Sequence, residues 1–198
     1  MKILFLPLTL FLIDQISKVF VRGISLPWLN INHSGFYPGE SKTIINNVLN
    51  ITLVENPGIA FGIDPGESLK DLVLILTILT CAGFFSYLVF VKGADKNIRI
   101  AVALILGGAA GNLFDRIFYG VFYNYAPLFQ GNVVDFLDIR LFSVFIFGNI
   151  HGNYVFNFAD VFILSGVFTL IYLVVKKKDK KKSEEVISEF VEESEDAA

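Results

Sequence analysis

The chain has 198 residues, of which 54% are hydrophobic and 18% are charged, and its mean hydropathy is +0.63. Soluble domains average about 25% charged residues, so this composition excludes an ordinary soluble domain and favours a membrane protein. The formal net charge of −3 averages a basic segment and an acidic tail, and no basic face or recognisable module indicates nucleic-acid binding.

Four apolar segments have the length of about 20 residues that a helix needs to cross a bilayer. They cover residues 4–21, 72–91, 98–118 and 156–175. The first segment is interrupted by Asp14 and Lys18, continues beyond them and is followed by no small-residue cleavage site. We therefore predict a retained helix here and not a cleaved signal peptide.

Basic residues predict the orientation of these helices. Lys2, residues 92–99 and residues 176–182 together hold ten of the 16 Lys and Arg residues. Because Lys and Arg are enriched in short cytoplasmic segments, both termini are predicted to be cytoplasmic, which agrees with an even number of spans.

The two longer connections then face the extracytoplasmic side. Residues 23–70 contain turn signals around short strand-like runs at residues 44–45 and 48–54, which predicts a small β-subdomain. Residues 119–155 are predicted to form an outer loop whose aromatic side chains lie at the membrane interface. Residues 183–198 are acidic, which predicts a disordered cytoplasmic tail.

The expected fold is therefore an all-α membrane protein. It is a four-transmembrane-helix bundle with a small extracytoplasmic β-subdomain between the first and second helices. Residues 1–182 would form a single membrane domain.

Polar residues inside the apolar helices are costly, so each one requires a reason. Asp14 and Lys18 are four residues apart and share one helix face, where they form either a structural ion pair or part of a chemical site. The third helix ends in a run of small residues that allows close helix packing, followed by Asn112, Asp115 and Arg116. This polar group either anchors the helix end or binds a polar backbone or a lipid headgroup.

Two further aspartates are predicted to lie at a common depth. Asp135 follows the outer end of the third helix, and Asp160 lies about one turn into the fourth. Two neighbouring carboxyl groups in an apolar place share one proton, and such a pair can activate a water and protonate a leaving amine, as in aspartic peptidases. The alternative is that both aspartates cap helices or pair with Arg. Asp138 is a rival, but Arg140 beside it suggests a solvated pair.

Other chemistries have little support in the sequence. His33 and His151 are not in a metal-binding motif, which makes zinc catalysis an unfavourable interpretation. Cys81 lies in an apolar segment, as a small buried residue would.

Five motifs in order resemble those of the lipoprotein signal peptidases, also called signal peptidase II, which are bacterial aspartic peptidases of the cytoplasmic membrane. The motifs are residues 14–18 (DQISK), 56–62 (NPGIAFG), 111–116 (GNLFDR), 133–136 (VVDF) and 156–160 (FNFAD). The chain departs from the familiar pattern in its long segment 119–130, its long segment 138–155 and its charged tail.

The resemblance implies roles for particular residues. It implies that Asp135 and Asp160 are the catalytic pair. It implies that a second group lines the substrate site, namely Asn56, Gly58, Asn112, Arg116 and Asn157. It also implies that Asp14, Lys18 and Asp115 support the site.

The resemblance also implies a substrate, namely a prolipoprotein whose cleavage-site cysteine carries a diacylglyceryl group. Cleavage would occur just before that cysteine, without a metal or an organic cofactor. Membrane lipids would be the other partners, and a monomer is expected in the bacterial cytoplasmic membrane.

Two hypotheses from other classes remain open. The buried charges could form an ion relay in a small transporter, although the acidic residues cluster at one face and no inverted repeat is present. Alternatively, the polar motifs could join helices in a non-enzymatic scaffold.

Overall fold

The computed structural model of the protein describes residues 2–57, 66–91, 93–139, 144–146, 149–151 and 154–196. Within these residues, four helices are long and apolar enough to cross a membrane, which confirms the four predicted apolar helices. They are α1 (Phe5–Arg22), α2 (Gly66–Phe90), α3 (Lys96–Phe114) with its continuation, and α5 (Phe158–Asp196). A short 3-10 turn, η1 (Lys2–Leu4), precedes α1.

Helix α3 lies at the centre of the bundle and packs against α1, α2 and α5. Its small residues explain this close packing. A Cβ atom added to Gly107 would lie 2.8 Å from the Cβ of Leu10 in α1. One added to Gly108 would lie 2.3 Å from the carbonyl oxygen of Ala159 in α5. The glycines therefore let two helix backbones approach α3 more closely than larger residues would allow.

The end of α3 changes its hydrogen-bonding pattern. Residues Asp115–Tyr119 form a π-helix, η4, which continues into the short helix α4 (Gly120–Phe122). Such π-helical turns are rare and are frequent at functional sites. Here the turn begins at Asp115, which is fully buried, and ends at Tyr119, which is 2% exposed.

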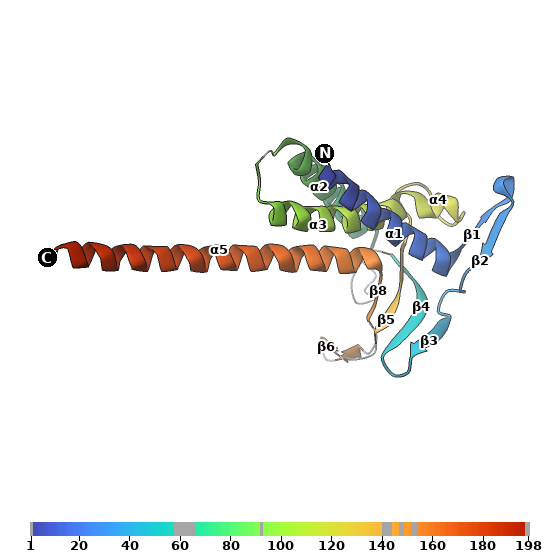
Figure 1. The fold of residues 1–198 in the computed structure, drawn as a ribbon. Helices are drawn as coiled ribbons and strands as arrows, with labels where there is room; N and C mark the ends of the chain where they lie inside the picture. The colour runs from blue at the N-terminus through green and yellow to red at the C-terminus, as the bar shows by residue number, and fades with distance from the viewer. Residues whose placement is uncertain are drawn as a thin grey trace.

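A four-stranded antiparallel sheet covers one end of the bundle (Figure 1). Its order is β3 (Ser41–Ile45), β4 (Leu49–Asn56), β5 (Val133–Ile139) and β8 (Tyr154–Phe156). Two hairpins stand apart from it. One pairs β1 (Gly23–Leu26) with β2 (Ile31–Ser34) around the 3-10 turn η2 (Pro27–Leu29), and the other pairs β6 (Val144–Ile146) with β7 (Asn149–His151).

The sheet corrects two predictions. The fold is not all-α, and the β-structure is not confined to residues 23–70, because β5 and β8 come from the segment predicted to be an outer loop. The reason lies in the composition of β5, which reads VVDFLDI. Its first four residues are buried, Asp135 included, so the apolar and polar residues do not alternate as they do in a strand with one solvated face.

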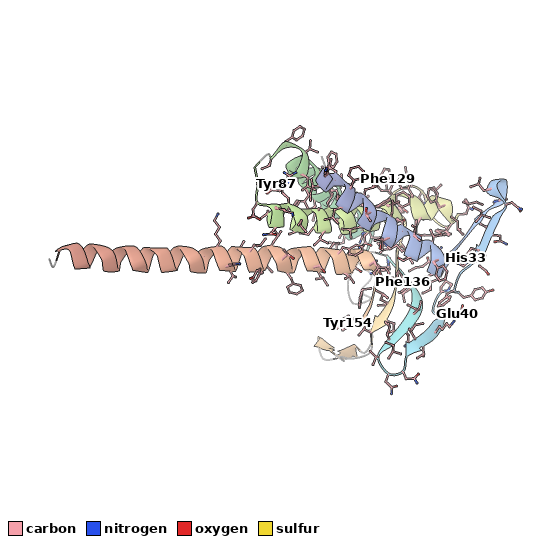
Figure 2. All side chains as sticks on the ribbon, in the orientation of Figure 1. His33, Glu40, Tyr87, Phe129, Phe136 and Tyr154 are labelled. Atoms are coloured by element: carbon pink, nitrogen blue, oxygen red, sulfur yellow. The ribbon has the colours of Figure 1, made fainter. Side chains whose placement is uncertain are left out.

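A hydrophobic cluster joins the bundle to the sheet. It contains Val21 from α1, Leu53 from β4, Tyr119 from η4, and Val134 and Phe136 from β5. Figure 2 shows Phe136 near the start of α5, whereas Tyr87 lies at the opposite end of the bundle. Residues about 80 positions apart in β4 and β5 are therefore held against the same helix ends.

Helix α5 extends well beyond the other three helices, and the N-terminus lies on the same side as its C-terminal half (Figure 1). The helix continues to Asp196, so the structure has a helix where the acidic composition predicts disorder. Lys and Glu, which dominate this segment, are both good helix formers, so a helix can continue without tertiary contacts.

Candidate active site

Asp135 and Asp160 are brought together through Asn157. Asp135 lies in the middle of β5 and is 3% exposed, and Asp160 lies in the first turn of α5. The side-chain nitrogen of Asn157 donates to Asp135 Oδ1 at 2.6 Å, and its backbone N–H donates to Asp160 Oδ2 at 3.1 Å. One residue therefore contacts both carboxyl groups.

The start of α5 explains the position of Asp160. Asn157 precedes the helix, and its side-chain oxygen accepts a hydrogen bond from Asp160 N at 3.0 Å. In return, the Asp160 carboxylate accepts from Asn157 N. This reciprocal capping box satisfies two free donors of the first helical turn and fixes the rotamer of Asp160.

Two more amides complete the contacts of the aspartates. Asn56 at the end of β4 donates to Asp135 Oδ2 at 2.9 Å, and Asn112 in α3 donates to Asp160 Oδ1 at 2.9 Å. Each of the four carboxylate oxygens therefore accepts a hydrogen bond from an Asn residue. Such donors stabilise charge on the aspartates and hold their oxygens in place.

Lys18 forms the centre of a buried ionic group behind these amides. Its Nζ lies 2.8 Å from Asp14 Oδ2 and 2.7 Å from Asp115 Oδ2, and it donates to Asn112 Oδ1 at 2.9 Å. The side chains of Lys18 and both aspartates are fully buried. The predicted pairing of Asp14 with Lys18 is confirmed, with Asp115 as a third member.

Asp14 and Asp115 each accept a hydrogen bond from a backbone N–H that lies one residue before Asp160 or Asp135. Asp14 Oδ1 accepts from the backbone N–H of Ala159, the residue before Asp160, at 3.0 Å. Asp115 Oδ2 accepts from the backbone N–H of Val134, the residue before Asp135, at 3.2 Å. The ionic group therefore anchors the backbone next to each of the two aspartates.

Gln15 is a member of this network that the sequence analysis did not identify. Its side-chain nitrogen donates to Asp14 Oδ2 at 3.1 Å and to Asp115 Oδ1 at 2.8 Å, and its oxygen accepts from the Tyr119 hydroxyl at 3.0 Å. The available signal was a polar amide beside Asp14 within an apolar helix, which predicts a hydrogen-bonded role.

Burial and a neighbouring negative charge raise the pKa of Asp135 from 3.8 to about 7. Removal from water is the larger cause, and the charge of Asp160 adds to it, while hydrogen bonds from Asn56 and Asn157 act in the opposite direction. A carboxyl group with this pKa can hold or release a proton near neutral pH.

Asp138 is not a member of this group. It is 1% exposed, and its Oδ2 accepts from Asn50 Nδ2 at 3.3 Å and from Thr52 Oγ1 at 3.1 Å, so the prediction that it is solvated is wrong. Because side chains alternate along a strand, Asp138 and Asp135 point to opposite faces of β5. Arg140, its predicted partner, lies outside the described residues, as does Gly58.

A family model described as signal peptidase (SPase) II matches residues 6–176. The chain belongs to the signal peptidase II family. It is thus a membrane protein of a peptidase family, in agreement with the four apolar helices.

Bacterial relatives align with most of the length of this chain. The lipoprotein signal peptidase of Desulfitobacterium hafniense (strain DSM 10664 / DCB-2) is 32% identical over 173 residues, covering 87% of this chain and 92% of the relative. That of Syntrophus aciditrophicus (strain SB) is 34% identical over 186 residues, covering 88% and 98%. A solved bacterial membrane enzyme, determined in meso at 2.3 Å, has a TM-score of 0.68 and 25% identity, with 91% of each chain covered.

The chain has a cavity of about 270 Å³. Arg116 belongs to its wall and also donates to the carbonyl oxygen of Asn112 at 3.2 Å. The other described lining residues are Pro57, Lys70, Asp71, Leu74, Tyr125, Ala126, Phe129, Gln130, Gly131 and Asn132. Neither Asp135 nor Asp160 is among the described lining residues, whereas Arg116 contacts Asn112, the amide that donates to Asp160.

Among the described residues, no group of three or more His, Cys, Asp and Glu side chains could hold a metal ion. The described side chains of the site supply carboxyl groups, amides, the ammonium group of Lys18 and the guanidinium of Arg116.

Proposed function

We propose that the protein is an aspartic endopeptidase that removes signal peptides from diacylglyceryl-modified prolipoproteins. In this proposal it cuts just before the lipid-bearing cysteine, and Asp135 and Asp160 activate the attacking water. The observation that carries the proposal is Asn157, which donates to Asp135 and to Asp160 at once and so keeps the two carboxyl groups together.

The reaction requires one proton shared by the pair. The ionised carboxylate takes a proton from water as the oxygen attacks the peptide carbonyl, and the protonated carboxyl group supplies a proton to the carbonyl oxygen. Collapse of the tetrahedral gem-diol breaks the C–N bond: the amine leaves with a proton from the pair, and one hydroxyl of the gem-diol returns its proton to the pair, which again holds one shared proton. The raised pKa of Asp135 supports a shared proton near neutral pH, and the pair titrates as a unit.

In this mechanism the side-chain amides of three Asn residues hold the carboxyl groups in place. Asn56, Asn112 and Asn157 hold the carboxylate oxygens, so the pair needs little rearrangement when charge moves during the reaction. Arg116, with five donors on a planar group, would bind substrate carbonyl or ester oxygens from the cavity wall. Gly58 belongs to the same proposed substrate site.

The proposed location is the bacterial cytoplasmic membrane, with both termini cytoplasmic and the active site at the extracytoplasmic face. The distribution of Lys and Arg supports this orientation. A substrate anchored by its lipid remains in the membrane, so its scissile bond lies near the membrane interface. The proposal requires no metal and no organic cofactor, and the protein acts as a monomer.

The decisive experiment uses the purified protein with a diacylglyceryl-modified prolipoprotein and its unmodified twin. We expect cleavage of the modified form alone, before the cysteine, and no cleavage by folded Asp135→Asn or Asp160→Asn variants. Full processing by either variant at equal protein level would remove that aspartate from the proposed pair. Ion flux in liposomes without any proteolysis would support a transporter instead.

A further inference from the structure

Arg22 lies at the junction of three segments that surround the candidate site. It is the last residue of α1, and its side chain is 12% exposed. Its Nη1 forms an ion pair with Glu55 of β4. Its guanidinium lies 4.0 Å from the centre of the Tyr123 ring and 5.5 Å from that of Tyr125. An arginine can make both contacts at once because its planar group pairs through its edge and stacks through its face.

The ion pair attaches the end of α1 to β4, the strand that carries Asn56. Glu55 directly precedes Asn56, and side chains alternate along a strand, so Glu55 meets Arg22 on one face while Asn56 faces Asp135. In the ladder, Asn56 lies opposite Val133 and diagonal to Asp135. Its hydrogen bond to Asp135 therefore depends on the register of β4 against β5.

The ladder is interrupted just before this segment. The pairing of β4 with β5 has an irregularity between Ile51 and Val54, which separates the three pairs of residues 54–56 from the earlier pairs. The ion pair of Arg22 with Glu55 lies within this short run of three pairs and adds a side-chain contact to it.

One of the two tyrosines, Tyr125, links the same arginine to the residue just before β5. The Tyr125 hydroxyl accepts from the backbone N–H of Asn132, the residue before β5, at 2.7 Å. The Tyr123 hydroxyl donates to the carbonyl oxygen of Gly23, next to Arg22, at 2.9 Å. Arg22 thus contacts β4 directly and β5 through Tyr125.

We infer that Arg22 is a positioning residue, which holds the ends of β4 and β5 in register so that Asn56 keeps its hydrogen bond to Asp135. This inference rests on the proposed function for its effect on activity. Arg22 itself contacts neither aspartate; it acts through Glu55 and Tyr125.

The test combines single and double variants in the cleavage assay. Arg22→Ala and Glu55→Gln are expected to lower kcat by about tenfold, with less than about a twofold change in KM, because a small displacement of a catalytic contact slows the chemical step. Arg22→Lys retains the charge but not the planar stacking, so its loss should be smaller than that of Arg22→Ala.

A double-variant cycle separates positioning from general destabilisation. In an Asn56→Ala background, Arg22→Ala should have less than about a twofold further effect, because the contact it positions is already lost. The high-pH limb of kcat/KM should move to higher pH in Arg22→Ala and in Asn56→Ala, since the Asn56 hydrogen bond lowers the pKa of Asp135. Asp160, Lys18 and Asn157 also affect the pKa of Asp135, and they are unchanged in these variants.

Arg99→Ala is the matched control. Arg99 donates to the carbonyl oxygens of Leu88 and Val91 at the far end of the bundle, so its loss affects stability without reaching β4. We expect no movement of the pH profile in this variant. Additive effects in the cycle, or an unchanged pH profile in Arg22→Ala, would overturn the inference.

Backbone hydrogen exchange tests the role of Arg22 without depending on catalytic activity. Backbone amides at residues 54–56 and 133–135 should exchange faster in Arg22→Ala than in Arg99→Ala, and equal exchange would contradict the inference. If the unaltered protein cleaves no prolipoprotein, the proposed function fails, while the exchange measurement still decides the role of Arg22.

Discussion

Lys18 Nζ donates to Asn112 Oδ1 at 2.9 Å, and this hydrogen bond determines which way the Asn112 amide faces. The same oxygen accepts from Asn157 Nδ2 at 3.1 Å, so the amide nitrogen of Asn112 is left to face Asp160. A lysine that touches neither candidate catalytic aspartate thereby orients a donor to one of them and an acceptor for the amide that contacts both.

This geometry predicts a specific effect of Asn112→Asp. The new carboxylate still accepts from Lys18, but it places an oxygen instead of a donor against Asp160. We expect a folded protein whose kcat falls by about a hundredfold or more, because a donor aimed at the reacting groups is lost. Prolipoprotein cleavage measures this, with Asn97→Asp near the start of the same helix as the control. A loss as large in Asn97→Asp would contradict it.

Lys18→Met should destabilise the protein severely. It leaves Asp14 and Asp115 buried without their shared cation, which costs about 3–5 kcal/mol. Thermal unfolding in detergent measures the loss, and exposed Lys96→Met is the control. Adding Asp14→Asn and Asp115→Asn should recover much of the stability, since no unpaired charge then remains buried. A loss below about 1 kcal/mol, as for a surface pair, would disprove this account.

The pKa of Asp135 predicts the high-pH limit of activity. With a value of about 7, the pair loses its shared proton as the pH rises through neutrality. The kcat/KM profile should therefore decline above about pH 7, because no carboxyl group can then protonate the substrate. Constant kcat/KM from pH 6 to pH 9 would show that the shared proton is not required.

The same pKa also predicts a dependence of stability on pH. The folded state binds the Asp135 proton more tightly than the unfolded state, in which the pKa is near 3.8. Stability from this group is therefore complete below pH 3.8 and is lost as the pH rises to about 7. Asp135→Asn cannot ionise, so its melting temperature relative to that of the unaltered protein should rise between pH 5 and pH 8. A constant difference would exclude the pKa shift.

Two glycines of the membrane helices should respond oppositely to alanine. A Cβ atom on Gly111 would lie 2.3 Å from Asp14 Oδ2, whereas one on Gly83 in α2 would meet nothing within 4 Å. We expect Gly111→Ala to lower both stability and activity by displacing Asp14. Gly83→Ala should be neutral or stabilising by up to about 1 kcal/mol, because alanine favours a helix. Equal melting temperatures would contradict this prediction.

The sequence predicts the helices well because their signals are local. The first helix is predicted at residues 4–21 and lies at Phe5–Arg22, and the spacing of Asp14 and Lys18 predicts their pairing within one helix. Strand β5 was missed because its main partner, β4, lies about 80 residues earlier and because Asp135 and Asp138 interrupt its apolar residues. The contacts of Asn157 depend on that sheet, so motif order indicates the site residues but not the hydrogen bonds among them.

The central pair of strands, β4 and β5, has a practical consequence for protein engineering. The two strands come from different connections but form one ladder, with Asn56 at the end of one and Asp135 within the other. Exchanging a single connection with a relative would mismatch the ladder and separate this amide from its carboxyl group. Chimaeras should therefore exchange both connections as a matched cassette, and an insertion is best tolerated away from residues 49–56 and 133–139.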